Sequence, residues 1–200
     1  IYAHNKLKNI EVNVIKKWFV GVVFGSIIGA ILASFFNGNI LVIIFVIIAS
    51  TVAISMFLNI NIVLASDIPQ NFFLNNFISF LIGCFSVLIG IGGGSFSVPT
   101  LTAFGKNIHR AVGTSASIGF FIALPGFITY ASTGWMIEGL PKYSLGYVNL
   151  PIVLTVASIS VLTAPLGAKL SNKANKKTLK KIFSIFLLLI CVSLVIDQYY

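Results

Sequence analysis

Acidic residues are scarce in this chain: four Asp or Glu stand against 13 Lys or Arg in 200 residues, so the net charge is +9. Charged residues make up only 8% of the sequence and hydrophobic residues 58%, with a mean hydropathy of +1.03. A soluble domain of this size does not need so apolar a composition. The basic residues stand between apolar windows, where they suit cytoplasmic loops and anionic lipid headgroups. The composition therefore indicates an integral membrane protein and argues against nucleic-acid binding.

Cysteine is scarce as well. Cys84 and Cys191 both lie in apolar windows, and the absence of CxxC or zinc-ligand spacing makes them small hydrophobic side chains in our interpretation. A nucleotide-binding GxxxxGK[ST] pattern is also missing. We therefore expect no metal, no cofactor and no catalytic residue. The chain begins at Ile1 with a polar segment and no signal-peptide pattern, and we expect it to be a piece of a longer protein.

What the chain does contain is a series of long apolar windows, most of them long enough to cross a hydrocarbon core of about 30 Å. The third window is too long and too interrupted to be one helix, and the turn Asn37-Gly38-Asn39 joins the first two. The windows are Trp18–Phe36, Ile40–Leu58, Phe72–Phe104, Ala111–Thr133, Val148–Ala168 and Ile182–Ile196. They predict an all-α, polytopic membrane protein of one domain.

The chain also repeats itself. Gly29-Ala30-x-Leu32 matches Gly167-Ala168-x-Leu170, and further pairs follow in the same order. We expect residues 1–66 to be the later half of a first repeat, with two transmembrane helices. Residues 67–200 would be a second repeat, with a glycine-rich broken helix and three transmembrane helices. The first repeat's own glycine-rich segment would then lie upstream of Ile1.

Loop charge bears on how the window Phe72–Phe104 sits in the membrane. If it crosses once, five basic residues lie on one face and eight on the other. If it enters, breaks and returns, the count becomes twelve against one, with only Lys142 on the sparse face. The positive-inside rule favours the re-entrant arrangement, which would also make the two repeats inverted, a common plan in transporters. A broken helix that crosses fully is the alternative.

The break in this window is the candidate functional segment. Gly90, Gly92, Gly93 and Gly94 disfavour a regular helix, and Pro99 removes a backbone donor. Irregular backbone inside a bilayer is tolerated only where protein buries it or where it lines a polar cavity. A half-helix starting after Pro99 would direct free N–H groups at an anion. Hydroxyl donors follow at Thr100, Thr102, Thr114, Ser115 and Ser117, while no Asp or Glu occurs between residues 83 and 133.

The candidate residues of this segment and of the start of the next window also have structural interpretations, which involve no substrate. The spacing of Gly90 and Gly94 is typical of close helix packing. His109 would be either a residue at the membrane interface or a proton-coupling or substrate-contacting group. Arg110 would be a topology anchor or a substrate clamp. The hydroxyls of Thr114 and Ser115 would bond back to helix carbonyls, or bind substrate.

The segment resembles the sulfite exporter TauE/SafE family of membrane transporter proteins. The matching residues are Gly83, Gly90-Ile91-Gly92-Gly93-Gly94, Pro99, Leu101, Gly105, His109, Ala111, Thr114-Ser115, Tyr130 and Gly134. Gly167-Ala168 and the lysine-rich loop after it also fit, so the resemblance covers nearly the whole chain. It implies a multi-pass carrier of the inner cell membrane that moves sulfur-containing or organic anions. The chain departs from the family by lacking the first glycine-rich segment.

Together, these features predict secondary transport of a small anion such as sulfite or an organosulfonate, coupled to the proton gradient. The predicted substrate-binding residues are Gly90, Gly92, Gly93, Gly94, Pro99, Thr114 and Ser115, with His109 and Arg110 as coupling or substrate contacts. The expected partners are the lipid bilayer and the anion, with no nucleic acid, and a homo-oligomer is allowed. Two alternatives are an intramembrane enzyme acting on a sulfur compound through Cys84 or His109, and a non-transporting membrane partner.

Overall fold

The computed structural model describes residues 9–36, 38–58, 64–90 and 92–199. In these residues the chain is almost entirely helical, and five helices are long and apolar enough to cross a membrane. The prediction of an all-α polytopic membrane protein is therefore confirmed. The helices are α2 (Val12–Ala33), α3 (Gly38–Phe57), α4 (Phe72–Leu88), α5 (Gly94–Ala103), α6 (Ile108–Thr133), α7 (Leu150–Lys173) and α8 (Lys176–Tyr199).

Asparagine side chains cap four of these helices, among them α8, where Asn175 accepts from the backbone N–H of Thr178 (2.8 Å). Asn71 accepts hydrogen bonds from the backbone N–H groups of Phe73 and Leu74 at the start of α4. Asn107 and Asn149 cap α6 and α7 in the same way. Such caps satisfy N–H groups that have no acceptor within the helix, so these helices begin where the sequence places the asparagines.

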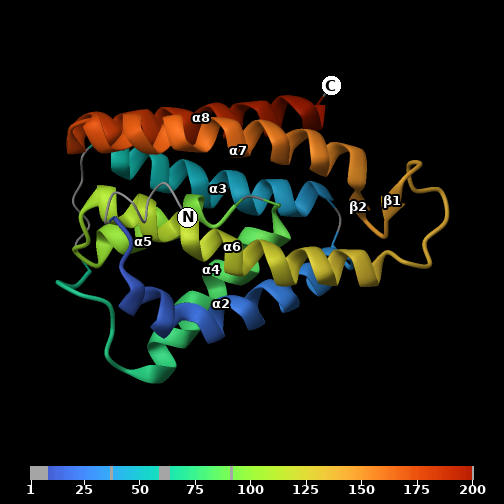
Figure 1. Ribbon diagram of the computed structural model, residues 1–200, viewed down its shortest axis with the longest axis horizontal. Helices are drawn as coiled ribbons and strands as arrows, with labels where there is room; N and C mark the ends of the chain where they lie inside the picture. Colours follow the sequence, from blue (N-terminus) through green and yellow to red (C-terminus); the bar gives the residue numbers. More distant parts are fainter. Residues whose placement is uncertain (1–8, 37, 59–63, 91, 200) are drawn as a thin grey trace.

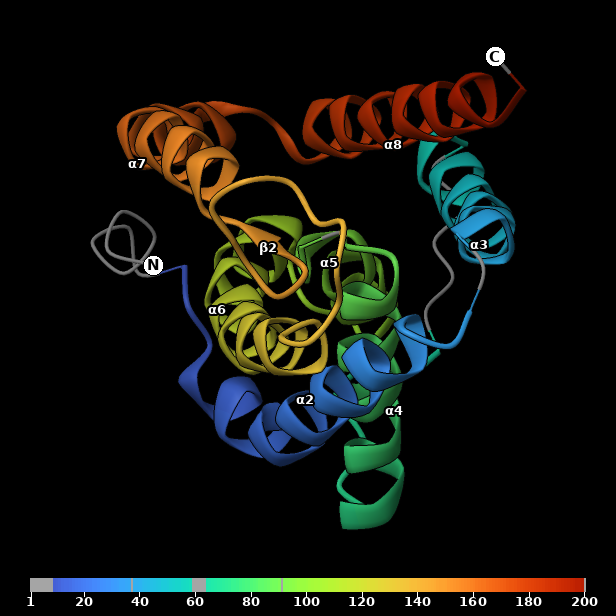
Figure 2. The same cartoon turned by 90° about the vertical axis from the view of Figure 1, so that its right-hand side faces the viewer.

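The long helices extend roughly along the horizontal axis of Figure 1, and Figure 2 shows α8 crossing obliquely from α7 toward α3. α2, α6 and α8 run in one direction and α3 and α7 in the other (Figure 1). The start of α2, the α5–α6 turn and the α7–α8 turn therefore lie at the same end of the molecule. We call it the basic end, because most of the described Lys and Arg residues belong to it. By their positions in these elements, ten of the eleven Lys and Arg in the described part of the chain belong to the basic end. The exception is Lys142, while Lys6 and Lys8 lie outside the described residues.

α2 packs against α4 through a row of glycines. Gly21, Gly25 and Gly29 lie so close to the α4 backbone that a Cβ atom at any of them would meet it, and Gly83 of α4 faces α2 in return. One-turn spacing of small residues lets two helices approach this closely in a membrane. The sequence interpretation gave this role to Gly90 and Gly94, and missed the longer row in α2.

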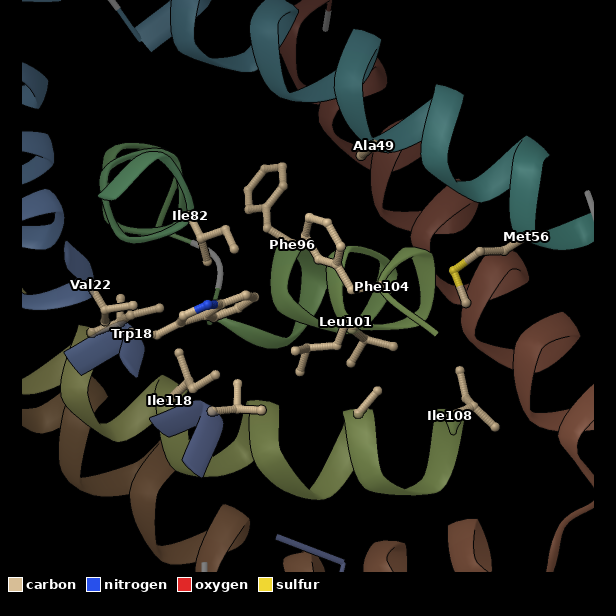
Figure 3. Close-up of a cluster of buried hydrophobic side chains, with 14 of the residues drawn as sticks. Trp18, Val22, Ala49, Met56, Ile82, Phe96, Leu101, Phe104, Ile108 and Ile118 are labelled. Atoms are coloured by element: carbon tan, nitrogen blue, oxygen red, sulfur yellow. The ribbon is translucent and has the colours of Figure 1, made fainter. Parts of the chain in front are cut away.

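The core between α2, α4, α5 and α6 contains one buried polar pair. The indole nitrogen of Trp18 donates a hydrogen bond of 2.8 Å to the side-chain oxygen of Asn75, and both residues are buried. Figure 3 shows the indole among Val22, Ile82 and Ile118. Away from water, the pairing satisfies two groups that would otherwise be costly to bury.

α4 and α5 form a helical hairpin whose two ends meet at the basic end. The backbone N–H of Leu64, which precedes α4, donates to the carbonyl of Ala103 at the end of α5 (2.8 Å). Lys17 at the start of α2 contacts Gln70 just before α4 (2.8 Å). This is the geometry that a re-entrant segment requires. Re-entry into a bilayer stays a prediction, as do the repeat and its boundaries at residues 66 and 67.

A short hairpin of β1 (Ser144–Leu145) and β2 (Val148–Asn149) connects α6 to α7 at the other end of the molecule. Its Tyr147 N–H donates to the carbonyl of Tyr130, which ties the hairpin to the last turns of α6. We assigned Val148 to the next helix, so this detail of the sequence prediction was wrong. α7 lies at the periphery of the helices (Figure 2), where most of its described side chains are exposed.

Candidate functional site

The break between α4 and α5 is formed by the glycine run. α4 ends at Leu88, Gly90 adopts a left-handed backbone conformation (φ +75°), and α5 begins at Gly94. Only glycine adopts this conformation without strain, so Gly90 is the residue that permits the chain to leave α4. Ile91, within the run, lies outside the described residues.

The break lies beside the middle of α6. A Cβ atom added to Gly93 would stand 2.6 Å from Cδ1 of Ile122 and 3.3 Å from Cα of Gly119. Both residues lie close to the midpoint of α6, which has 26 residues and a length of about 39 Å. Since α6 is long enough to span a membrane, the break is expected near half the depth of a bilayer.

The four glycines have different surroundings. Gly93 is packed against α6, so helix packing accounts for it. By contrast, a Cβ atom added at Gly90, Gly92 or Gly94 would meet no atom of the described residues within 4 Å. Packing does not explain these three glycines, and their backbone is open to approach.

Pro99 does not mark the start of a half-helix, and that prediction was wrong. α5 begins five residues earlier, at Gly94, and continues through Pro99 to Ala103. Proline leaves the carbonyl four residues earlier, that of Ser95, without its helical donor, but such a defect is tolerated inside a protein-packed membrane segment. The N-terminus that can face an anion is therefore the first turn of α5, which adjoins the glycines directly.

The hydroxyl groups around the break fall into two classes. Thr100 and Thr102 donate to carbonyls of their own helix, those of Phe96 and Pro99. Thr114 accepts a hydrogen bond from the backbone N–H of Glu11 (3.0 Å). The second class comprises buried hydroxyls with no hydrogen-bond partner in the part of the chain that the structure describes, at Ser86, Ser97, Ser115 and Ser117. The back-bonding proposed as an alternative for Ser115 does not occur.

By their register, Ser97 and Ser115 lie at the same level of the α5–α6 contact. α5 and α6 are antiparallel, because only residues 104–107 connect them, and Gly93 contacts Gly119. Ser97 lies one turn after Gly93 and Ser115 one turn before Gly119, so both are displaced toward the basic end on the contacting faces. Leu101, one turn further, lies between the two helices (Figure 3).

Sequence reasoning selected Ser115 but missed Ser97. Nothing in the local pattern separates Ser97 from Ser95, since both follow the glycines within four residues. The distinction comes from the packing of α5 on α6, which buries Ser97 completely and leaves Ser95 half-buried.

His109 and Arg110 lie at the opposite end of α5 from the glycines, about 15 Å along the helix axis. Arg110 is exposed, and its guanidinium is 3.5 Å from the Glu11 carboxylate. His109 is half-buried, and its Nδ1 has no hydrogen-bond partner. The structure therefore does not bring these two residues together with Gly90–Gly94.

An ion-pair network joins three segments at this end of α5. The Nζ of Lys106 lies 3.0 Å from Glu11 and 2.9 Å from Asp67. The hydrogen bond with Lys106 and a backbone N–H from Ile68 lower the pKa of Asp67. The same hydrogen bond raises the pKa of Lys106. The network ties both ends of the α4–α5 hairpin to the start of α2.

A cavity of about 370 Å³ opens beside this network. Its lining combines three lysines with two carboxylates and neutral side chains, namely Glu11, Asn13, Val14, Lys16, Lys17, Asp67, Ile68 and Lys106. The excess of one positive charge would attract small anions to the basic end.

These features define a class: a multi-pass, all-helical membrane protein with a glycine-rich break midway along its helices. Comparison with known proteins places the chain more narrowly. The profile of the sulfite exporter TauE/SafE family matches residues 1–194, and the chain belongs to this family.

Two relatives are named as probable membrane transporter proteins. One, from Haemophilus influenzae, is 43% identical over 114 residues, which are 57% of this chain and 43% of the relative. The other, from Methanocaldococcus jannaschii, is 31% identical over 187 residues, which are 92% of this chain and 68% of the relative. The chain thus spans less than half of the first relative and about two thirds of the second. No solved structure matches it.

Proposed function

We propose that this chain is part of a secondary transporter for small anions, with sulfite, organosulfonates or related sulfur-containing or organic anions as substrates. The protein would reside in the inner cell membrane and use the proton gradient, which is the simplest energy source for a chain without a nucleotide-binding motif. The substrate would bind at the α4–α5 break, midway along α6.

One observation carries this proposal. A helix N-terminus, open glycine backbone and buried hydroxyls without partners meet at one level of the helices, near the middle of α6. Helix N-termini and free N–H groups favour anions, and buried hydroxyls without partners are donors available to a ligand. Transporters place their substrates at broken helices near the bilayer midplane for the same reason. The names of the two relatives support the coarser statement, that of a membrane transporter.

An intramembrane enzyme is the less favoured alternative. It would need Cys84 and His109, or one of them with a partner. Cys84 lies on α4 beside Gly29, near the end of α2, whereas His109 starts α6 near the beginning of α2. About 25 Å along α2 separate Gly29 from Val12, so the two side chains do not form one site.

Anion flux into proteoliposomes tests the proposal. The full-length protein should carry radiolabelled sulfite faster than empty liposomes do, with saturation at high concentration, and an imposed proton gradient should alter the rate. A product formed in detergent, without a gradient, would instead support the enzyme. If no sulfur-containing or organic anion is carried faster than in empty liposomes, the result would support the alternative of a non-transporting membrane partner.

A further inference from the structure

We propose that the break binds singly charged oxyanions, and that the hydroxyls of Ser97 and Ser115 are its substrate-contacting donors. This inference rests on the proposed function and adds two things to it: the charge state of the substrate and a binding residue, Ser97, that the sequence does not reveal. It follows from the unpaired hydroxyls beside the break and from the absence of Asp and Glu between residues 83 and 133.

The two hydroxyls are in an unusual state. Ser97 is 0% exposed and Ser115 is 1% exposed, and neither oxygen has a hydrogen-bond partner. Buried hydroxyls are normally paired, as those of Ser26 and Ser79 are with carbonyls of their own helices. Two unpaired hydroxyls at the same level of the α5–α6 contact, one turn from the Gly93–Gly119 contact, are donors without an acceptor. An oxyanion offers several acceptor oxygens and can accept from both.

Their complete burial means that this conformation occludes them. Ser97 and Ser115 lie between α5 and α6, so an anion reaches them when α5 separates from α6 near the glycines. Added Cβ atoms at Gly92 and Gly94 would meet no described residue within 4 Å, so the contacts that this movement breaks at the glycines are those of Gly93 with Ile122 and Gly119. Such occlusion and exposure of one site is what alternating access requires.

The charge state follows from the fixed charges. Residues 83–133 contain no Asp or Glu, and their only Lys and Arg are Lys106 and Arg110. Both lie at the far end of α5 and contact carboxylates, those of Glu11 and Asp67. The first turn of α5 then supplies the main positive potential, equivalent to about half an elementary charge. The cost of moving an ion out of water grows with the square of its charge, so a singly charged anion fits this site and a doubly charged one does not.

Transport of three anions distinguishes a site for singly charged anions from a site that also accepts doubly charged ones. Methanesulfonate is singly charged and sulfate doubly charged at neutral pH, while sulfite changes from one state to the other near neutrality. We expect saturable methanesulfonate flux, sulfate flux at the level of empty liposomes, and a ratio of sulfite to methanesulfonate flux that falls from about pH 6.5 to about pH 8. The ratio cancels any pH dependence that proton coupling imposes on both substrates. Sulfate carried as fast as methanesulfonate, or a constant ratio, would overturn the charge assignment.

The hydroxyls are tested by Ser97→Ala and Ser115→Ala. Each should raise the KM for methanesulfonate about tenfold, the effect of losing one hydrogen bond to a charged group. Neither should lower the melting temperature, because an unpaired buried hydroxyl is lost. Ser26→Ala is the matched control: Ser26 is equally buried, but its hydroxyl donates to Val23 at 2.8 Å and lies outside the site. It should leave KM unchanged.

The outcomes distinguish this inference from the function on which it rests. Wild-type protein that carries none of the three anions would refute the transport proposal and this inference together. Wild-type flux with unchanged KM in both serine variants would refute the role of the hydroxyls and leave transport standing.

Discussion

The hydroxyl of Tyr130 donates a hydrogen bond of 2.8 Å to the carbonyl oxygen of Val87. This bond joins α6 to the last turn of α4, three residues before Gly90. Val87 also accepts from the N–H of Gly90 itself (3.0 Å), so the same carbonyl both starts the break and holds it against α6. The position of the break therefore depends on a tertiary contact as well as on the glycines.

Tyr130→Phe should loosen this attachment. Losing one buried hydrogen bond is expected to reduce stability by about 1 kcal/mol, which corresponds to a melting temperature about 2–4 °C lower. Anion flux should fall as well, because the break is no longer fixed. Tyr143→Phe is the control, since Tyr143 is exposed. Equal melting temperatures for the two variants would show that the bond does not hold the break.

The close approach of α2 to α4 predicts a strong effect at Gly25. A Cβ atom there would meet the backbone of Phe80, which cannot move aside as a side chain can. Gly25→Ala should destabilise the protein by about 1–3 kcal/mol, measured by thermal unfolding in detergent. Gly167→Ala is the control, because nothing lies within 4 Å of its added Cβ. A Gly25→Ala protein as stable as this control would contradict the packing of α2 on α4.

The ion-pair network predicts how stability depends on pH. The pKa of Asp67 is lower in the folded protein than its ordinary value of 3.8. Its contribution is therefore complete above that value, and disappears as the pH falls through the folded-state pKa. The pKa of Lys106 is raised above 10.5, so its contribution is lost only above that pH. Asp67→Asn should flatten the acid side of the melting-temperature profile, and the effect should be small, because Asp67 is 54% exposed.

High salt should weaken the same network by screening. Lys177→Met, an exposed lysine at the α7–α8 turn, is the control for a general charge effect. A wild-type profile identical to that of Asp67→Asn above about pH 4, where the Asp67 contribution should be complete, would show that the ion pair does not stabilise the fold.

The re-entrant arrangement can be tested by cysteine labelling. In a background with Cys84 and Cys191 replaced, single cysteines at Ser66 and Asn107 should lie on the same side of the membrane. A membrane-impermeant maleimide added to intact cells should label neither, while a cysteine at Lys142 should react. Labelling of only one of the first two positions would show that the α4–α5 segment crosses the membrane instead of returning.

The sequence predicts the spans and the break well, for clear physical reasons. Apolar windows of sufficient length mark helices wherever the solvent is lipid, and four glycines in five positions cannot be packed into one helix. The ends of the predicted windows accordingly lie within six residues of the helix ends. Pro99 misled the prediction because proline ends helices in water, whereas the packed environment of α5 tolerates it.

What the sequence does not reveal depends on tertiary contacts. In the sequence, α2 looks like an ordinary apolar helix. The packing role of its glycine row becomes visible only when α4 lies against it. Ser97 is distinguished from Ser95 only by the packing of α5 on α6, which buries it. The fold places Arg110 beside Glu11 and away from the break, and the sequence does not show this pairing. His109 remains a prediction as a coupling group, as do Thr114 and Ser115 as substrate ligands.

The central claim is that an anion binds against the open backbone of the α4–α5 break, and Gly94→Ala tests it most directly. An added Cβ at Gly94 meets no atom of the described residues within 4 Å, and alanine favours the helix by about 1 kcal/mol, so folding should be preserved. Gly93→Val is unsuitable, because its side chain would collide with Ile122. The measurement is the KM for sulfite flux in proteoliposomes. Our account predicts a several-fold increase for Gly94→Ala and no change for Gly167→Ala, whereas wild-type KM in both variants would contradict it.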